Sequence, residues 1–223
     1  MLLGIIGGMG PHATICFLQR LLECTPIINE QNHIPYLLIS TPEIPDRSKS
    51  ILSNNQQTIQ TIREKLAYNA KLLERSNVTQ IVMICNTAHY WEDDIRDAIS
   101  IPFISIIEET CKYLTDNSMN NVCIMSTLAT KQSGMYDRYL TGIDFAYPNN
   151  KQQNKITNAI YMIKCKKCSE ATNILREVVD SLKSEGFEYF VVACTELPIV
   201  LNGPEFVNPS SILVKRILEL YKN

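Results

Sequence analysis

Short apolar runs alternate with stretches whose apolar residues have helical spacing along the whole chain. Apolar runs of strand length lie at residues 2–6, 36–39, 80–85, 103–105, 122–125, 143–147 and 189–194. Such β-branched runs are typical of parallel strands buried on both faces. Helical spacing predicts helices over 11–23, 56–74, 90–98, 106–114, 135–140, 155–165, 171–184 and 209–221. Strands that alternate with helices predict an α/β protein with parallel sheets.

Two of the predicted strands end in the same way. One run ends at Cys85 and another at Cys194, and small hydroxyl or amide side chains follow both thiols. The two cysteines are separated by about half of the chain, and each follows a long helix and a strand. This spacing predicts two related α/β halves. Ligands of open α/β sheets bind beyond the carboxyl ends of the strands, so we expect both thiols to face one substrate.

Two facing thiols suit a proton transfer at carbon. One thiolate removes a proton while the other thiol delivers one to the opposite face, which is general acid–base catalysis with two bases and inverts a stereocentre. A single thiolate would instead suit nucleophilic catalysis. The plain alternative is that Cys85 and Cys194 are two unrelated core cysteines, and the matched contexts of the two residues argue against it.

Composition and charge narrow the classes of function. The formal net charge of −2 gives no electrostatic reason to expect nucleic acid or an anionic membrane surface as partner. No apolar run approaches the roughly 20 residues that span a bilayer. The first residues, 1–8, lack the basic segment and cleavage site of a signal peptide, so we expect a cytoplasmic protein.

The eight cysteines do not predict a disulfide framework or a metal site. Four of them lie within apolar helical or strand patterns and are expected to act as small hydrophobic residues: Cys16, Cys24, Cys111 and Cys123. Residues 165–168 have C-x-x-C spacing, but no second pair of ligands completes a zinc site and no thioredoxin-like context surrounds them. We interpret this spacing as a coincidence on a helix–helix connection.

The first turn after residues 2–6 formally matches a dinucleotide-binding fingerprint, G-x-G-x-x-A, over residues 8–13. The second predicted strand ends at Ser40 and Thr41 without the acidic residue that holds a ribose, which argues against an NAD-dependent oxidoreductase. The prolines within 41–48 predict a loop there, because proline is excluded from helix interiors and strand ladders.

Six motifs in order give the chain a family resemblance. They are Gly7-Gly8-Met9-Gly10-Pro11, Ile44-Pro45-Asp46-Arg47, Cys85-Asn86-Thr87-Ala88-His89, Ile107-Glu108-Glu109-Thr110, Ser133-Gly134-Met135-Tyr136 and Cys194-Thr195-Glu196. The chain resembles the aspartate/glutamate racemase family over essentially its whole length, closest to the aspartate racemase branch. The resemblance implies two α/β domains with the active site in the cleft between them, usually in a homodimer. It also implies racemisation of a small acidic amino acid without pyridoxal phosphate, metal or another cofactor.

The resemblance assigns roles to particular positions. Cys85 and Cys194 match the two acid/base thiols. The substrate-binding positions that it implies are Met9, Asp46, Arg47, Ser48, Asn86, Thr87, Ala88, Thr127, Lys164 and Thr195. Arg47 matches the position that recognises the distal carboxylate, and the donor fork of arginine suits a dicarboxylate in a way that lysine cannot reproduce.

Several positions leave alternatives open. Ungapped alignment puts Cys165 at the family's substrate-binding lysine, whereas a gap of one residue selects Lys164, which we prefer. Thr127 and Thr130 either contact substrate or cap the next helix. His89 either tunes the first thiol or caps a helix, and Glu196 either orients the substrate ammonium group or is structural. Ile84 and Ala129 replace a proline and a glycine that relatives often carry.

The resemblance and the predicted strands together suggest domain limits and rival functions. We expect a first domain over 1–112, a second over 113–208, and a final helix over 209–223 that packs back on the first. Rival functions on the same scaffold are a hydantoin racemase, a maleate isomerase or a decarboxylase-like enzyme. A non-catalytic protein that binds an acidic amino acid is a rival from another class, and the two matched cysteines argue against it.

Overall fold

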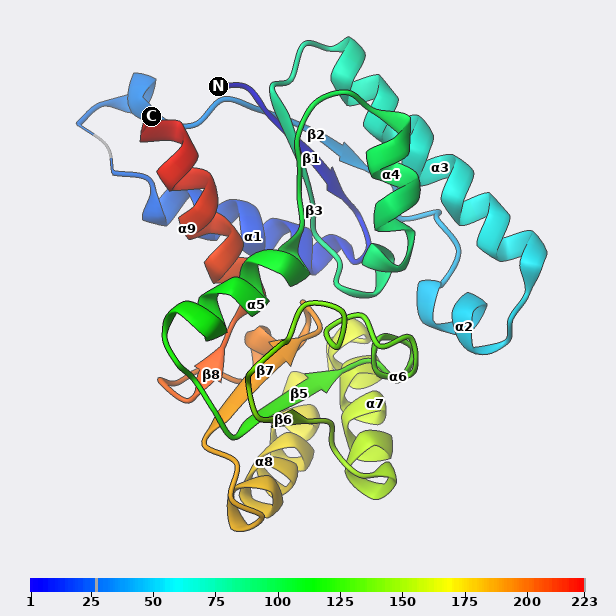
Figure 1. Ribbon diagram of the computed structural model, residues 1–223, viewed down its shortest axis with the longest axis vertical. Helices are drawn as coiled ribbons and strands as arrows, with labels where there is room; N and C mark the ends of the chain where they lie inside the picture. Colours follow the sequence, from blue (N-terminus) through cyan, green and yellow to red (C-terminus); the bar gives the residue numbers. More distant parts are fainter. Residues whose placement is uncertain (27, 223) are drawn as a thin grey trace.

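The structure, a computed structural model that describes residues 1–26 and 28–222, contains two four-stranded parallel sheets (Figure 1). Their strand orders are β2-β1-β3-β4 and β6-β5-β7-β8. In each sheet, the strand that comes first in the sequence lies between the second and the third. Leu3 pairs with Gln80 in the first sheet, and Val122 pairs with Tyr189 in the second. The repeated order confirms the predicted pair of similar parallel-sheet halves.

The elements of the first half run from the amino terminus to the end of α5. Its strands are β1 (Leu3–Gly7), β2 (Tyr36–Ser40), β3 (Gln80–Met83) and β4 (Phe103–Ile104). Its helices are α1 (Pro11–Cys24), α2 (Arg47–Leu52), α3 (Gln56–Arg75), α4 (Glu92–Ala98) and α5 (Ile106–Asp116), with the short 3₁₀ helices η1 (Glu30–Asn32) and η2 (Thr87–Trp91). The glycine turn before α1 ends at Pro11, whose fixed φ suits the first position of a helix.

The second half contains the remaining elements. Its strands are β5 (Val122–Ser126), β6 (Phe145–Ala146), β7 (Tyr189–Ala193) and β8 (Phe206–Val207). Its helices are α6 (Leu128–Gln132), α7 (Asn150–Lys164) and α8 (Cys168–Ser184), with the 3₁₀ helix η3 (Leu197–Ile199), and the last helix of the chain, α9 (Pro209–Lys222), follows them. Residue 223, the last of the helix expected over 209–223, lies outside the described residues.

The structure corrects several predicted elements. The segment 135–140, expected to be a helix, continues a series of turns over 133–139 in which Gly134 has a φ of 57°. The loop expected over 41–48 ends early, because α2 already begins at Arg47. The helix α6 was not predicted, and Cys24, expected in a buried pattern, is exposed. The C-x-x-C segment does join two helices, because Cys165 caps the end of α7 and Cys168 begins α8.

Three apolar layers hold the sheets and helices together. Alternate residues of the first sheet point to opposite sides, with Ile6 packed in the cluster that contains α3 and α4, and Ile5 in the central cluster. The outer cluster of the second sheet contains residues of α7 and α8. The central cluster contains residues of both sheets together with α1, α5 and α9. The two halves therefore share one apolar core.

The last helix lies against both halves. In Figure 1, α9 runs beside α1 and α5, and Arg216 Nε on α9 is 3.3 Å from Glu109 Oε1 on α5. Buried residues of α9, such as Leu213, belong to the central cluster that also contains strands of the second sheet. The domain limits of 1–112 and 113–208, with α9 assigned to the first, remain a prediction.

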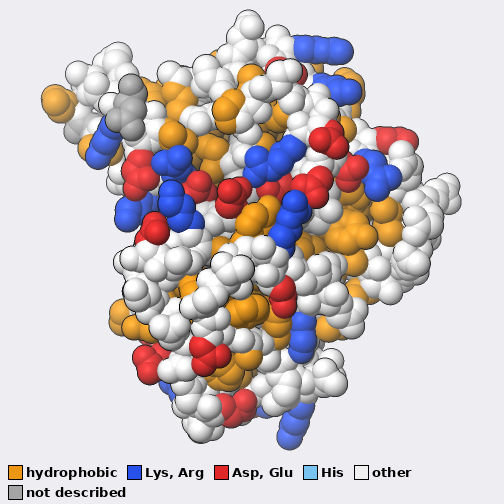
Figure 2. Space-filling view, in the orientation of Figure 1, with side chains coloured by type: hydrophobic (Ala, Val, Ile, Leu, Met, Phe, Trp, Pro, Cys, Tyr) orange, Lys and Arg blue, Asp and Glu red, His pale blue; other side chains and the backbone are white. Residues whose placement is uncertain are grey.

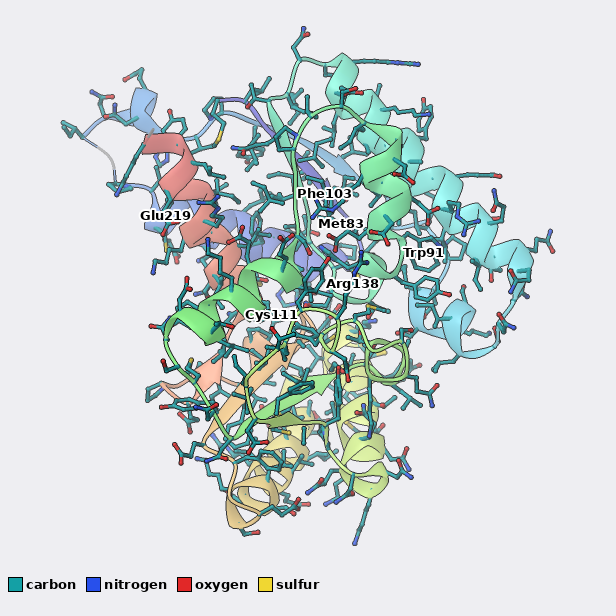
Figure 3. All side chains as sticks on the ribbon, viewed as in Figure 1. Met83, Trp91, Phe103, Cys111, Arg138 and Glu219 are labelled. Carbon is teal, nitrogen blue, oxygen red and sulfur yellow. The ribbon has the colours of Figure 1, made fainter. Side chains whose placement is uncertain are left out.

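Charged side chains gather across the middle of the face shown in Figure 2, where the two halves meet. One of the ion pairs that join the halves links Arg138 Nη1 to Asp93 Oδ2 at 3.0 Å. Arg138 lies at this junction in Figure 3, with Trp91 on the first-half side. In the described part of the chain, no helix is long and apolar enough to cross a membrane.

Candidate active site

A small cavity lies between the two sheets, lined by residues that follow the carboxyl ends of β1, β3, β5 and β7, by the start of α2 and by the end of α7. Its empty space, including the part open to solvent, is about 310 Å³. The lining residues are Met9, Asp46, Arg47, Ser48, Cys85, Asn86, Thr87, Thr127, Lys164, Cys194, Thr195 and Glu196. Of the predicted substrate-binding positions, only Ala88 is absent from this lining, because its side chain is fully buried in the cluster around α3.

The first loop owes its course to Gly8. This residue has a φ of 87°, and a Cβ at its position would lie 2.5 Å from the backbone nitrogen of Thr41. Its amide donates a hydrogen bond of 2.9 Å to Thr14 Oγ1. The tight turn places Met9, which is 2 % exposed, in the wall of the cavity. A glycine is required here both by the backbone conformation and by the close approach of the next strand's end.

The two thiols stand at equivalent places in the two halves. Cys85 follows β3 and is 7 % exposed, whereas Cys194 follows β7 and is 5 % exposed. Both line the same cavity, as the prediction of two thiols that face one substrate requires. Parallel strands bring their carboxyl ends to one edge of a sheet, and here the two edges face each other across the cavity.

A carboxylate lies against the second thiol. Cys194 Sγ is 3.0 Å from Glu196 Oε2, and the thiol donates to this oxygen. Burial first, and then the charge of Glu196, raises the pKa of Cys194 well above its ordinary value. Thr195 Oγ1 donates to the same carboxylate oxygen at 3.4 Å. Cys194 is therefore held protonated at neutral pH, and Glu196 contacts the thiol directly.

The start of α2 presents Arg47, Asp46 and Ser48 to the cavity. Asp46 is the N-cap, and its Oδ1 accepts a hydrogen bond of 2.8 Å from the amide of Lys49. Arg47 Nη1 donates to two carbonyl oxygens of the preceding loop, those of Ile44 and Pro45, each at 3.1 Å. Among the described residues, Arg47 Nε is buried without a hydrogen-bond partner. The guanidinium is thus fixed by its own loop and keeps a donor unused.

The turn after Cys85 supplies a second unused donor. Asn86 is 2 % exposed, and its Oδ1 accepts a hydrogen bond of 2.7 Å from the hydroxyl of Tyr136. Its Nδ2 has no partner within residues 1–26 and 28–222. An unpaired buried donor costs about 1–3 kcal/mol, and both of these donors belong to residues that line the cavity, which favours a ligand rich in acceptor oxygens.

Three threonine hydroxyls meet where the halves touch. Thr87 Oγ1 lies 2.9 Å from Thr127 Oγ1 and 3.1 Å from Thr130 Oγ1, and the last two are 3.0 Å apart. Thr127 also caps α6, because its hydroxyl oxygen accepts a hydrogen bond from the amide of Thr130. Both readings of Thr127 are therefore compatible with its position, since it caps a helix and lines the cavity.

Lys164 lies at the carboxyl end of α7 and reaches the cavity from the second half. Desolvation lowers its pKa, but the negative groups around it, Glu196 first, outweigh this effect and raise the pKa overall. Cys165, the alternative in the ungapped alignment, is exposed and is not part of the lining. The structure therefore brings Lys164, and not Cys165, to the two thiols.

His89 supports the first thiol through the backbone. Its Nε2 accepts a hydrogen bond of 3.2 Å from the amide of Ile106, so the proton is on Nδ1, which donates to the carbonyl of Cys85 at 2.8 Å. Burial lowers the pKa of His89, which keeps the ring neutral. His89 lies outside the cavity lining, and its contact is with the Cys85 carbonyl rather than the thiol. It links the thiol-bearing turn to the start of α5.

The contact between Tyr136 and Asn86 was missed by the sequence analysis. Tyr136 belongs to one of the quoted motifs, but no role was assigned to it there. The two residues are 50 positions apart and come from different halves, so no local pattern predicts their hydrogen bond. Gly10 is a second such case, because a Cβ there would lie 3.1 Å from Glu196 Oε1.

Comparison with known proteins agrees with the fold and the motifs. Residues 6–210 match the family described as Asp/Glu/hydantoin racemase. A broad specificity amino-acid racemase, RacX, of Bacillus subtilis is 26% identical over 99% of this chain and 98% of its own length. The structure of Picrophilus torridus aspartate racemase superimposes with a TM-score of 0.86 at 28% identity, covering 99% of this chain and 94% of that one. An aspartate racemase homologue from Pyrococcus horikoshii has the same fold, with a TM-score of 0.79 at 22% identity and 99% coverage of both chains.

Proposed function

Because the chain belongs to the Asp/Glu/hydantoin racemase family, we propose that it interconverts the L and D forms of aspartate, and of glutamate where the cavity admits it. The reaction is a two-base proton transfer at Cα between Cys85 and Cys194 and uses no cofactor. The observation that supports an acidic substrate most directly is the pair of unused buried donors, Arg47 Nε and Asn86 Nδ2, on the cavity wall within the described residues. Carboxylate oxygens are the acceptors that such donors pair with most strongly.

The proposed roles follow from the positions around the cavity. Asn86 and Lys164 bind the α-carboxylate, and Arg47 binds the distal carboxylate. Charge that develops on the α-carboxylate as Cα loses its proton is stabilised by these donors, which are already in place before the reaction. Met9 and the buried walls exclude water from the reacting carbon.

In each direction of the reaction, one thiol group acts as the base and the other as the acid. In one direction the Cys85 thiolate takes the α-proton, so a C–H bond breaks and an S–H bond forms. The thiol proton of Cys194, which in the resting protein is donated to Glu196, passes to the opposite face of Cα and leaves Cys194 as thiolate. In the other direction the roles exchange. The product differs from the substrate only in the configuration at Cα.

A wider substrate range is the second candidate. The relative from Bacillus subtilis is named a broad specificity amino-acid racemase. Beside Lys164, an adjoining groove is lined by apolar side chains that include Leu52 and Tyr161, which are 42% and 68% exposed. This wall favours side chains larger and less polar than that of aspartate. A homodimer and a cytoplasmic location also remain predictions that the family resemblance supports.

Incubation with single enantiomers in deuterium oxide tests the proposal. We expect the wild-type protein to racemise L- and D-aspartate and to incorporate deuterium at Cα. Chiral chromatography measures the racemisation, and NMR measures the deuterium at Cα. A panel with glutamate and with larger apolar amino acids separates the narrow from the wide substrate range. Absence of both exchange and racemisation with every amino acid in the panel would refute the function.

Single substitutions of the thiols test the mechanism. Cys85→Ser and Cys194→Ser should each lower racemisation by about 100- to 10,000-fold, because a serine hydroxyl is a far weaker acid than a thiol and proton transfer contributes about 10²–10⁴-fold. Cys165→Ser, which changes an exposed thiol outside the cavity lining, serves as the matched control and should retain wild-type rates. Near-wild-type turnover in either catalytic variant would contradict the two-thiol mechanism.

A further inference from the structure

Tyr136 is a fully buried residue of the second half whose hydroxyl reaches into the first half. It lies in the turns between α6 and β6, and its ring packs in the central cluster shared by the two sheets. Its hydroxyl donates a hydrogen bond of 2.7 Å to Asn86 Oδ1. Tyr136 does not belong to the cavity lining, so it does not touch a ligand there itself.

The side-chain amide of Asn86 carries a hydrogen-bond donor, Nδ2, and an acceptor, Oδ1. Which of these two atoms faces the cavity decides whether the amide attracts or repels a carboxylate. With Oδ1 turned to Tyr136, the Nδ2 donor is left without a partner among the described residues. A flipped amide would present an acceptor oxygen to the cavity and would repel a carboxylate. A phenolic hydroxyl can donate or accept, and here it donates to Oδ1, which is the first of these orientations.

We propose that Tyr136 is a positioning residue that holds the Asn86 amide with Nδ2 directed at the substrate carboxylate. This inference rests on the proposed function, which assigns the α-carboxylate to Asn86. Close packing restrains the tyrosine ring, and the ring restrains the amide, so the donor is in place before substrate arrives. Burial raises the pKa of Tyr136 well above its ordinary value, so the hydroxyl remains a donor throughout the neutral and mildly alkaline range.

Steady-state kinetics and calorimetry of Tyr136→Phe test the proposal. We expect kcat/KM for aspartate to fall about 5- to 100-fold, and the Kd measured by titration with L-aspartate to rise, because loss of a buried hydrogen bond of this kind corresponds to about 1–3 kcal/mol. Tyr139→Phe is the matched control. It removes a hydroxyl three positions away that donates to Glu92 Oε1 outside the cavity lining, and it should change kcat/KM less than about twofold.

A double-mutant cycle separates positioning from general destabilisation. Because Tyr136 acts through Asn86, Tyr136→Phe should add less than about a twofold loss in an Asn86→Ala background. A full additional loss in that background would overturn the proposal, because the tyrosine would then act by another route. Thermal unfolding of each variant shows that the assays are made on folded protein.

Asn86→Asp tests the orientation independently of any folding defect in Tyr136→Phe. The aspartate keeps an acceptor for Tyr136 but replaces the Nδ2 donor by a carboxylate oxygen, so the protein should fold and lose affinity for L-aspartate. Retained affinity would overturn the proposal, since it would mean that an oxygen already faced the ligand. Wild-type protein that binds L-aspartate without racemising it would refute the proposed function alone, whereas wild-type protein that does neither would refute both.

Discussion

Cys194 and Glu196 show at the scale of single residues why the two thiols are not equivalent. Their contact of 3.0 Å joins a buried thiol to a carboxylate oxygen, and burial and this charge together raise the pKa of Cys194. The sequence located both cysteines from the ends of two apolar runs. It did not indicate which of them is held protonated, because that depends on whether the Glu196 side chain contacts the Cys194 thiol.

The pH dependence of turnover tests this contact. Cys194 must be protonated when it delivers the proton to Cα, so activity in that direction is lost as the pH rises through the pKa of Cys194. Glu196→Gln removes a negative charge that raises this pKa, so we expect the alkaline limb of the kcat/KM profile to move to lower pH. The profile of each enantiomer is measured separately.

A matched control for this prediction is Glu188→Gln. Glu188 is exposed and accepts a hydrogen bond from Asn121 away from the cavity, so its variant should keep the wild-type profile. An alkaline limb that does not move in Glu196→Gln would show that the carboxylate is structural.

The helices at the scale of elements show which sequence signals were sufficient and which were overlooked. The long helices α3 and α8 were predicted because their apolar residues recur at helical spacing. The spacing of apolar residues predicts that α7 starts at 155, whereas the structure has its start at Asn150. Asn149 and Gln152 form a reciprocal capping box there, a pattern that is visible in the sequence. The turns at 135–140 were mistaken for a helix because their buried residues resemble a short apolar face.

Removal of the α7 cap should separate stability from activity. Asn149→Ala should lower the free energy of unfolding by about 0.5–2 kcal/mol, because the N-cap side chain accepts hydrogen bonds from two backbone amides of the first turn. Lys164 lies at the other end of α7, so kcat/KM should remain at the wild-type value. Urea unfolding and the racemisation assay measure the two quantities.

Asn150→Ala is the neighbouring control for the same element. Asn150 is exposed at the first helical position, and its variant should be within about 0.5 kcal/mol of wild type. Equal stability of Asn149→Ala and wild type would contradict the role given to the cap.

At the scale of the whole molecule, the sequence predicts two similar parallel-sheet halves. It does not predict that the two halves share one apolar core. The strand pattern fixes neither how two sheets pack nor which helices lie between them, because those contacts join residues far apart in sequence. The site shows the same limit, since its two thiols follow from a pattern while the unused donors of Arg47 and Asn86 follow only from three-dimensional packing.

The shared core predicts that both halves unfold together. Leu213 of α9 is fully buried in the central cluster, and Leu213→Ala should cost about 2–5 kcal/mol of unfolding free energy. The fluorescence of Trp91, the single tryptophan, reports the first half, and far-UV circular dichroism reports the whole chain. We expect the two transitions to coincide in the wild type and in the variant.

The same substitution at a surface position provides the comparison. Leu72 on α3 is 41% exposed, so Leu72→Ala should change the unfolding free energy far less than Leu213→Ala. Separate transitions for the two signals would show that the halves are thermodynamically independent units.

The three threonine hydroxyls that meet between the halves have a mechanical consequence. Thr87 comes from the first half and Thr127 and Thr130 from the second, so any motion that parts the two sides breaks two of the three contacts and leaves the third intact. At about 0.5–1.5 kcal/mol for each hydrogen bond, the ring opposes separation by about 1–3 kcal/mol. That restraint adds to the shared core and limits how far the two sides of the cavity can move apart before the ring breaks.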